Sequence, residues 1–199
     1  MSVSGIGPGD TAMMARCVEL SKVAAAEGEI PFASLIAKNG EVIVEATNRV
    51  VRDKDVTRHA EIVAITEAQR VLGSRVLSGC TLYSTIEPCP MCAFPTREAQ
   101  IGRVVFGLRS PLMGGLSKWN ILRDEEVARV MPEAFGNVPE VIAGVLAREV
   151  EDVWKAWNPL AWRVIRYRGC FAGTEAPALE QFSAVKSRRF FRQLLAIHR

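Results

Sequence analysis

The sequence has few histidines, few aromatic residues and no long apolar run. Two of its 199 residues are histidines, His59 and His198, and aromatic side chains make up 7%. No stretch approaches the roughly 20 uncharged apolar residues that a membrane-spanning helix needs, so we expect no membrane association. Residues 1–5 also lack the basic cluster and apolar stretch of a secretory signal. These absences, with an apolar content of 49%, predict a globular cytoplasmic protein.

Cysteine occurs an odd number of times, at Cys17, Cys80, Cys89, Cys92 and Cys170. An odd count in a chain without a visible signal favours a reducing compartment, where thiols bind metals, act in catalysis or pack in the core. Cys17 lies on an apolar helical face, and Cys80 and Cys170 lie beside glycines, so we expect these three to be packing residues. Cys89 and Cys92 remain for chemistry.

Hydrophobic periodicity predicts an alternating α/β chain. The expected helices span 11–27, 59–71, 91–99, 124–130 and 146–157, and the expected strands span 32–38, 41–47, 81–86, 103–107 and 141–145. Asn39-Gly40 between the first two strands is a hairpin signal, so these strands should be antiparallel. The later alternation of strand and helix predicts crossover connections within one layered sheet.

The basic residues are concentrated at the C-terminal end. Residues 158–199 contain eight Lys or Arg and two Glu, a net charge of +6. Because the whole chain has a net charge of +3, residues 1–157 have a net charge of −3. We predict a catalytic domain over 1–157 and a C-terminal basic extension over 158–199 that packs on the domain or on a partner subunit. A cluster of Trp154, Trp157 and Trp162 favours such packing.

Within the extension, residues 183–197 have the pattern of a basic amphipathic helix. The run 186–192 (KSRRFFR) allows two interpretations. Basic residues interleaved with aromatics can bind RNA phosphates and stack on bases. We favour the alternative, a solvated helix face with the aromatic side chains packed inward.

The residues with the clearest chemistry are His59-Ala60-Glu61 and Pro88-Cys89-Pro90-Met91-Cys92. Two cysteines three residues apart at the start of a helix can place both sulfurs on one metal, and the unpaired N–H groups there favour thiolates. An imidazole and two thiolates form a three-ligand set that leaves the fourth tetrahedral position of zinc open, as in catalytic sites. We therefore predict one Zn²⁺ per subunit on His59, Cys89 and Cys92.

Glu61 follows the histidine by two residues, so its carboxylate can lie beside the metal without binding it. Zinc lowers the pKa of a bound water to about 7, and an adjacent carboxylate can carry the water proton to a leaving nitrogen. Hydrolytic deamination needs both functions. We therefore predict Glu61 as the catalytic proton carrier.

His-x-Glu followed by Pro-Cys-x-x-Cys is the signature of zinc nucleobase deaminases. Over residues 11–155 the chain resembles the cytidine deaminase-like superfamily, in the branch that contains guanine deaminase, yeast-type cytosine deaminase and the tRNA wobble-adenosine deaminase. The matching segments are 29–32, Asn48, 55–61, 81–92 and 101–107. The resemblance implies a three-layer α/β/α sandwich around a five-stranded mixed sheet, and a homodimer.

The resemblance also implies the substrate contacts. Asn48 would hydrogen-bond the base, Phe32 would line the pocket, the backbone around Ala60 and the Glu87-Pro88 pair would contact the ring edge, and the Cys89 N–H would help to hold the hydrated intermediate. Trp119 either closes over a planar ring or belongs to the core. The chain departs from the family pattern at Ala33-Ser34, Arg58 and Phe94-Pro95, which predicts an altered pocket wall.

Three functions remain open. The first is a hydrolase that removes the exocyclic amino group of a free nucleobase or related ring, such as a guanine-like purine, cytosine or a triazine, and releases ammonia. The alternative is a tRNA-specific wobble-adenosine deaminase, and the third is a noncatalytic zinc-stabilised binding module. A purely structural zinc normally takes four protein ligands, which argues against the third.

Overall fold

The structure is a computed structural model that describes residues 5–174, except for the side chain of Pro8. The predicted helix at 183–197, its basic run at 186–192 and His198 therefore lie outside the described residues. No helix within 5–174 has both the length and the apolar character that crossing a membrane requires.

A five-stranded mixed sheet forms the centre of the fold. Its strands are β1 (Ala33–Lys38), β2 (Glu41–Thr47), β3 (Cys80–Ile86), β4 (Arg103–Leu108) and β5 (Glu140–Ala143), in the order β2-β1-β3-β4-β5. β1 is antiparallel to both β2 and β3, whereas β3, β4 and β5 are parallel. The hairpin turn at Asn39 and Gly40 has positive φ at both residues, 53° and 82°, which suits the twist of an antiparallel pair. The predicted sheet and hairpin are confirmed.

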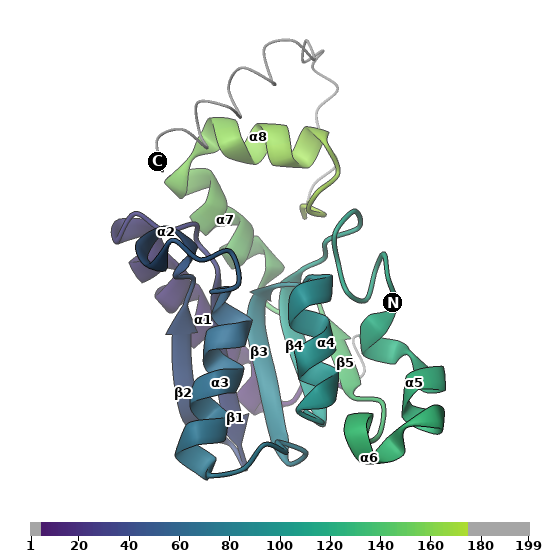
Figure 1. The fold of residues 1–199 in the computed structure, drawn as a ribbon. Helices are drawn as coiled ribbons and strands as arrows, with labels where there is room; N and C mark the ends of the chain where they lie inside the picture. Colours follow the sequence, from purple (N-terminus) through teal and green to yellow (C-terminus); the bar gives the residue numbers. More distant parts are fainter. Residues whose placement is uncertain (1–4, 175–199) are drawn as a thin grey trace.

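Helices cover both faces of this sheet (Figure 1). α1 (Pro8–Ala26) and α7 (Ala147–Trp157) lie on one face, and α3 (Ala60–Leu72) and α4 (Pro90–Glu98) lie on the other. Successive strand residues point to opposite faces, so Leu82 packs in the cluster under α3 and α4 while Tyr83 packs in the cluster under α1. The predicted three-layer α/β/α sandwich is therefore confirmed.

Short helices occur where periodicity predicted little. They are α2 (Val50–Asp53), the 3₁₀ turn η1 (Ile121–Arg123), α5 (Glu125–Val130), α6 (Pro132–Phe135) and α8 (Pro159–Tyr167). Only α5 was expected from the sequence. The sequence analysis predicts no helix directly after residue 158, yet α8 begins there: the Asn158 side chain accepts a hydrogen bond from the Ala161 N–H at 2.9 Å, and Pro159 occupies the first helical position. An N-cap asparagine followed by proline is a helix-start signal.

The segment from 158 to 174 packs against the main body. Trp154 of α7 lies 5.5 Å from Trp157 and 6.3 Å from Trp162 of α8, measured between ring centroids, so the predicted aromatic cluster exists. Beyond α8, the Ala172 N–H donates to the Arg109 carbonyl at 2.8 Å. These contacts place the described part of the segment on the domain. The division of the chain at residue 157 stays a prediction.

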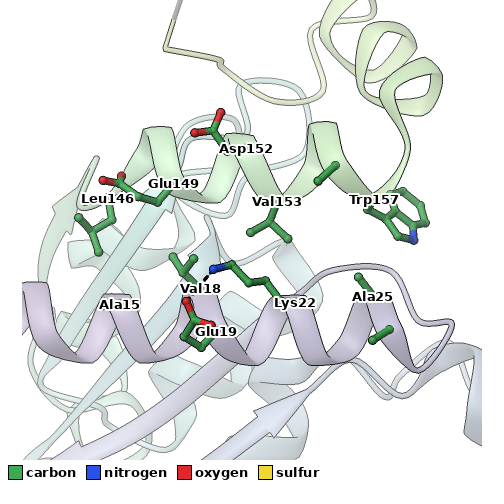
Figure 2. Close-up of a pocket in the computed structure, with 12 residues that line it drawn as sticks. Ala15, Val18, Glu19, Lys22, Ala25, Leu146, Glu149, Asp152, Val153 and Trp157 are labelled. Atoms are coloured by element: carbon green, nitrogen blue, oxygen red, sulfur yellow. Dashed lines mark hydrogen bonds and ion pairs between the residues drawn. The ribbon is translucent and has the colours of Figure 1, made fainter.

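A groove of about 720 Å³ runs between α1 and α7. Figure 2 shows Val18 and Val153 facing each other across it, with Glu19 and Lys22 of α1 joined by an ion pair of 2.7 Å. Because both helices lie on the face of the sheet opposite α3 and α4, this groove is separate from the predicted metal ligands.

Candidate metal centre

The three predicted metal ligands come together at the N-terminal ends of two helices. His59 is the residue immediately before α3, and Cys89 is the residue immediately before α4, with Cys92 in the first turn of that helix. The Nδ1 atom of His59 lies 3.6 Å from the Cys89 sulfur and 3.5 Å from the Cys92 sulfur, and the two sulfurs are 3.6 Å apart. Among residues 5–174, these side chains form a candidate metal-binding group.

The distances fit a tetrahedral zinc ion. With Zn–S bonds of about 2.3 Å and a Zn–N bond of about 2.0–2.1 Å, tetrahedral angles place the two sulfurs about 3.8 Å apart and each sulfur about 3.6 Å from the nitrogen. The measured separations agree with these values to about 0.2 Å. Three ligands leave one coordination position open. The donor set therefore fits a catalytic zinc.

The local electrostatics favour thiolate at this position. The hydrogen bond with Cys92, and after it the one with His59, lowers the pKa of Cys89 to about 4. The same sulfur contact and burial raise the pKa of Cys92, and the Cys89 contact raises the pKa of His59. A thiolate beside an imidazole is the state that a metal cation requires of its ligands.

Glu61 lies in the first turn of α3 and is 5% exposed. Burial raises its pKa above the ordinary value for a glutamate, and the neighbouring Cys89 charge adds to the effect. One carboxylate oxygen lies 3.4 Å from the Ser84 hydroxyl, which in turn lies 3.2 Å from the Ser34 hydroxyl. A carboxyl group held beside a metal centre can serve as a general acid and base.

One wall of the centre comes from the first two strands. The ring of Phe32 lies parallel to the His59 imidazole, with 8° between the planes and 6.3 Å between the centroids. The Asn48 backbone N–H donates to the Phe32 carbonyl at 3.0 Å, so this asparagine lies beside the same wall. Asn48 is 2% exposed. The structure thus brings Phe32, Asn48 and Glu61 to the end of the sheet that holds the metal ligands.

Residues 9–108 match the model of the cytidine and deoxycytidylate deaminase zinc-binding region. The match spans half of the chain and includes all three metal ligands and Glu61. The chain is a zinc-dependent deaminase of this family.

Relatives in several organisms support the assignment. A tRNA-specific adenosine deaminase of Bacillus subtilis is 37% identical over 150 residues, which cover 74% of this chain and 88% of the relative. A guanine deaminase of the same species is 48% identical over 62 residues, 31% of this chain and 40% of the relative. A tRNA(Ile)-lysidine synthase of Deinococcus deserti is 36% identical over 145 residues, but that match spans 26% of the relative's length.

A solved tRNA:A34 deaminase has the same fold. It superposes with a TM-score of 0.63 at 30% sequence identity, and the match covers 72% of this chain and 99% of the solved one. The zinc-dependent hydrolytic class predicted from His59, Glu61, Cys89 and Cys92 is therefore confirmed.

In this deaminase the Glu87 side chain holds a loop rather than facing the pocket. Its carboxylate accepts hydrogen bonds from the Ser110, Leu116 and Ser117 N–H groups and from the Ser117 hydroxyl, at 2.5–2.9 Å. The Glu87 N–H donates to the Leu108 carbonyl, and the Pro88 carbonyl accepts from the Gly115 N–H at 2.7 Å. A contact between Glu87 and a substrate, which stays a prediction, would have to use its carbonyl.

The loop over 110–120 approaches the Pro-Cys motif closely. A Cβ at Gly115 would lie 2.9 Å from the Pro88 carbonyl oxygen, so the close approach requires glycine there. Trp119, at the end of this loop, is 58% exposed and has the Lys118 ammonium 5.9 Å from its ring centroid. Trp119 is therefore not a core residue, and its predicted contact with the substrate remains open.

The departures from the family pattern have separate structural roles. Arg58 pairs with Asp53 at 3.1 Å. Phe94 is 46% exposed and makes an edge contact with Phe135, with 5.2 Å between the centroids. Ser34 is linked to Glu61 through Ser84: its hydroxyl lies 3.2 Å from the Ser84 hydroxyl, which lies 3.4 Å from a Glu61 carboxylate oxygen. A changed pocket wall is thus a prediction that rests on the serine pair.

Sequence reasoning assigned no role to two further residues near the centre. Phe171, from the segment after α8, makes an edge contact with Phe32. Glu29, in the loop after α1, accepts a hydrogen bond from the Asn48 side chain at 2.9 Å. The segment 29–32 is one of those that match the family, so the resemblance could have pointed to a role for Glu29. No local pattern marks Phe171.

Proposed function

We propose that this chain hydrolyses the exocyclic amino group of an adenosine at the wobble position of transfer RNA. The observation that carries the proposal is the extent of similarity: the tRNA-specific adenosine deaminase of Bacillus subtilis aligns over 74% of this chain and 88% of its own length. The alignment with the guanine deaminase of that species covers 31% of this chain. The sequence pattern favours a free nucleobase over tRNA, whereas the longer match favours tRNA.

The chemistry follows from the residues of the centre. His59, Cys89 and Cys92 would hold a zinc ion, which supplies an activated water when bound. Glu61 would take one proton from the attacking water and deliver it to the ring nitrogen, then take the second proton of that water and deliver it to the amino nitrogen, which leaves as ammonia. Burial raises the pKa of Glu61 above that of an ordinary glutamate, which strengthens it as the base that accepts a proton.

The surroundings supply the contacts that a nucleotide needs. Phe32 provides an apolar wall beside His59, and the first backbone N–H groups of α3, around Ala60, would contact the ring edge, because they have no carbonyl partner within the helix. Farther out, the exposed Trp119 and the neighbouring Lys118 suit base stacking and phosphate contact. Residues 49–58, which contain α2, carry four basic and two acidic side chains. We call Trp119, Lys118 and residues 49–58 the rim of the site. An RNA loop would contact this rim, whereas a free base would not reach it.

A second candidate is a free nucleobase of the guanine type. Two observations favour it: the 48% identity to a guanine deaminase over 62 residues, and the packing of residue 171 against Phe32, which adds a wall to the site. The same residues would catalyse this reaction. The two candidates differ in whether the rim contributes to binding.

Ammonia release separates the candidates. The zinc-loaded full chain would be assayed with an anticodon stem-loop carrying a wobble adenosine, with the same stem-loop carrying guanosine there, and with free guanine, adenine and cytosine. For RNA, kcat/KM should fall steeply between low and moderate salt, because binding releases counterions. Release from a free base alone, insensitive to salt, overturns the tRNA proposal and establishes the second candidate.

Trp119→Ala provides an internal check. If the tryptophan stacks on an RNA base, its removal costs about 1–3 kcal/mol of binding, so KM for the stem-loop should rise by about fivefold or more while the zinc content is unchanged. Tyr167→Ala, at the end of α8 and 57% exposed, is the matched control for loss of an exposed aromatic side chain. An equal effect of the two variants on KM would contradict the role of Trp119.

We also propose a homodimer, as the family resemblance implies. The supporting observation is Phe94 on α4, a large apolar side chain that is 46% exposed two residues after the metal ligand Cys92. Contact with a second copy would remove this apolar surface from water. Light scattering of the purified chain would test it, and a monomer at micromolar concentration would refute it.

A further inference from the structure

Glu29 is a buried carboxylate whose hydrogen bonds all come from one small region. It is 3% exposed and lies just after α1. Its Oε1 atom accepts from the Arg52 N–H at 2.7 Å, and its Oε2 atom accepts from the Val51 N–H at 3.2 Å and from the Asn48 side chain at 2.9 Å. Val51 and Arg52 belong to the first turn of α2, whose own N-cap residue makes no side-chain bond. Glu29 therefore caps α2 from a distant part of the chain.

This arrangement determines which way the Asn48 amide faces. Backbone N–H groups can only donate, so both Glu29 oxygens act as acceptors. The group of Asn48 that meets them must then be its NH₂, which is a donor, and its oxygen must face away. The assignment of amide nitrogen and oxygen follows from the chemistry of the partner.

The Asn48 oxygen is left without a partner. Oδ1 is buried and has no hydrogen-bond partner within residues 5–174, although buried polar atoms are nearly always paired. Asn48 adjoins Phe32, whose ring lies parallel to the metal ligand His59. An unpaired acceptor beside the metal centre is suited to a hydrogen-bond donor on a ligand in that space.

We propose that Glu29 is a positioning residue that fixes the Asn48 amide with Oδ1 as an acceptor for an N–H or O–H group of the substrate. The inference rests on the proposed function in that the donor belongs to the substrate of the deaminase, an amino, ring N–H or sugar hydroxyl group. Without Glu29 the Asn48 amide can rotate so that its NH₂ group takes the place of Oδ1. The NH₂ group then repels the N–H or O–H donor of the substrate. Glu29 thus contributes to substrate selection without touching the substrate.

The test removes one of the two acceptor oxygens of Glu29, because a glutamine amide offers a single oxygen to the Asn48 NH₂ and the two backbone N–H groups. Glu29→Gln, compared with Glu27→Gln on the exposed carboxylate two residues earlier, would be assayed in the zinc-loaded full chain with the stem-loop RNA and with free guanine. The bond is made in the ground state as well as the transition state, so KM should rise by about tenfold or more while kcat changes by less than about threefold. Unchanged KM and kcat in Glu29→Gln overturn the proposal.

A reversed pair separates positioning from general support of α2. In the double variant Glu29→Gln/Asn48→Asp, the Gln NH₂ can donate to one Asp oxygen, which leaves the other oxygen as the outward acceptor. The double variant should recover KM relative to both single variants. If it is no better than Glu29→Gln alone, although its melting temperature is restored, Glu29 acts only on stability and the proposal fails.

A readout without substrate keeps the inference separate from the proposed function. The side-chain NH₂ signals of Asn48 in a ¹⁵N–¹H spectrum, assigned by their absence in Asn48→Asp, should shift in Glu29→Gln and not in Glu27→Gln. If the wild-type chain deaminates neither substrate, the proposed function fails and this spectrum alone decides the inference. Unchanged Asn48 signals in Glu29→Gln overturn it.

Discussion

Phe171 stands edge-on to Phe32, with 6.2 Å between the ring centroids and 89° between the planes. The two residues are far apart in the sequence, yet the contact links the segment after α8 to the aromatic wall beside the metal ligand His59. Phe171 is 4% exposed and also meets Trp154 at 5.1 Å. The segment after α7 is therefore part of the support of the site.

Phe171→Ala should destabilise the protein and impair activity together. Removing a buried phenylalanine costs about 3–5 kcal/mol through lost burial and the cavity left behind, and Phe32 loses a lateral contact. Urea unfolding and KM measured well below the transition would check both effects. Leu160→Ala, at an exposed position of α8 (40%), is the control and should change neither. A stable Phe171→Ala variant with wild-type KM would show that the contact is dispensable.

Glu61→Gln should abolish turnover and keep the metal. The amide has the shape of the carboxyl group but cannot carry a proton, so kcat should fall by about 10²–10⁴-fold. Metal analysis should still give one zinc per chain, because the three ligands are untouched. Glu67→Gln, on the same helix and paired with Arg70 at the surface, should retain activity. Wild-type turnover in Glu61→Gln would remove the proposed role.

Cys92→Ser should lose zinc, whereas Cys170→Ser should not. Cys92 is buried within the three-ligand group, and Cys170 lies outside it. Metal binding to the folded state raises stability by mass action, so the melting temperature of the wild type should fall on treatment with a strong chelator. The Cys92→Ser variant should show no such response. Zinc retained at wild-type stoichiometry in Cys92→Ser would contradict the ligand assignment.

Asp10 should make stability depend on acid pH. The hydrogen bond from Arg103, which lies 2.5 Å away, is the largest cause that lowers its pKa from 3.8 to about 2. Because the folded-state pKa is below the unfolded value, the contribution is complete above about pH 4 and is lost as the pH falls toward 2. It amounts to about 2 kcal/mol.

The Asp10→Asn variant tests this dependence. Its free energy of unfolding should be lower than that of the wild type at pH 7, and the difference should shrink as the pH is lowered to about 2. Asp152→Asn, at an exposed carboxylate 3.9 Å from Lys155, should have an effect below about 1 kcal/mol. A difference between Asp10→Asn and the wild type that does not change with pH would show that the charge is not the cause.

Much of the chemistry could be predicted from local sequence. His59 and Glu61 occupy one helical turn, and Cys89 and Cys92 begin another, so their spacing already places compatible donors together. Strand and helix periods predict the alternation of strands and helices for the same reason, since a repeat of two or of 3.6 residues is a local property, whereas the three-layer sandwich is implied by the family resemblance. Short helices such as α2 and α6 have too few residues to show a period.

Contacts between distant residues required the tertiary structure. The Glu29 carboxylate meets Asn48, and Phe171 meets Phe32, only because separate segments fold against the same end of the sheet. Glu87 is predicted to contact the substrate through its backbone, and only the structure shows that its carboxylate is occupied by backbone groups of a loop more than 20 residues away. The sequence predicts the three metal ligands, which the structure brings together, and the order of the strands and longer helices; Glu61 as the proton carrier stays a prediction. Packing decided which polar groups are already paired and which, like the Asn48 oxygen, are left for a ligand, because hydrogen-bond partners depend on three-dimensional proximity.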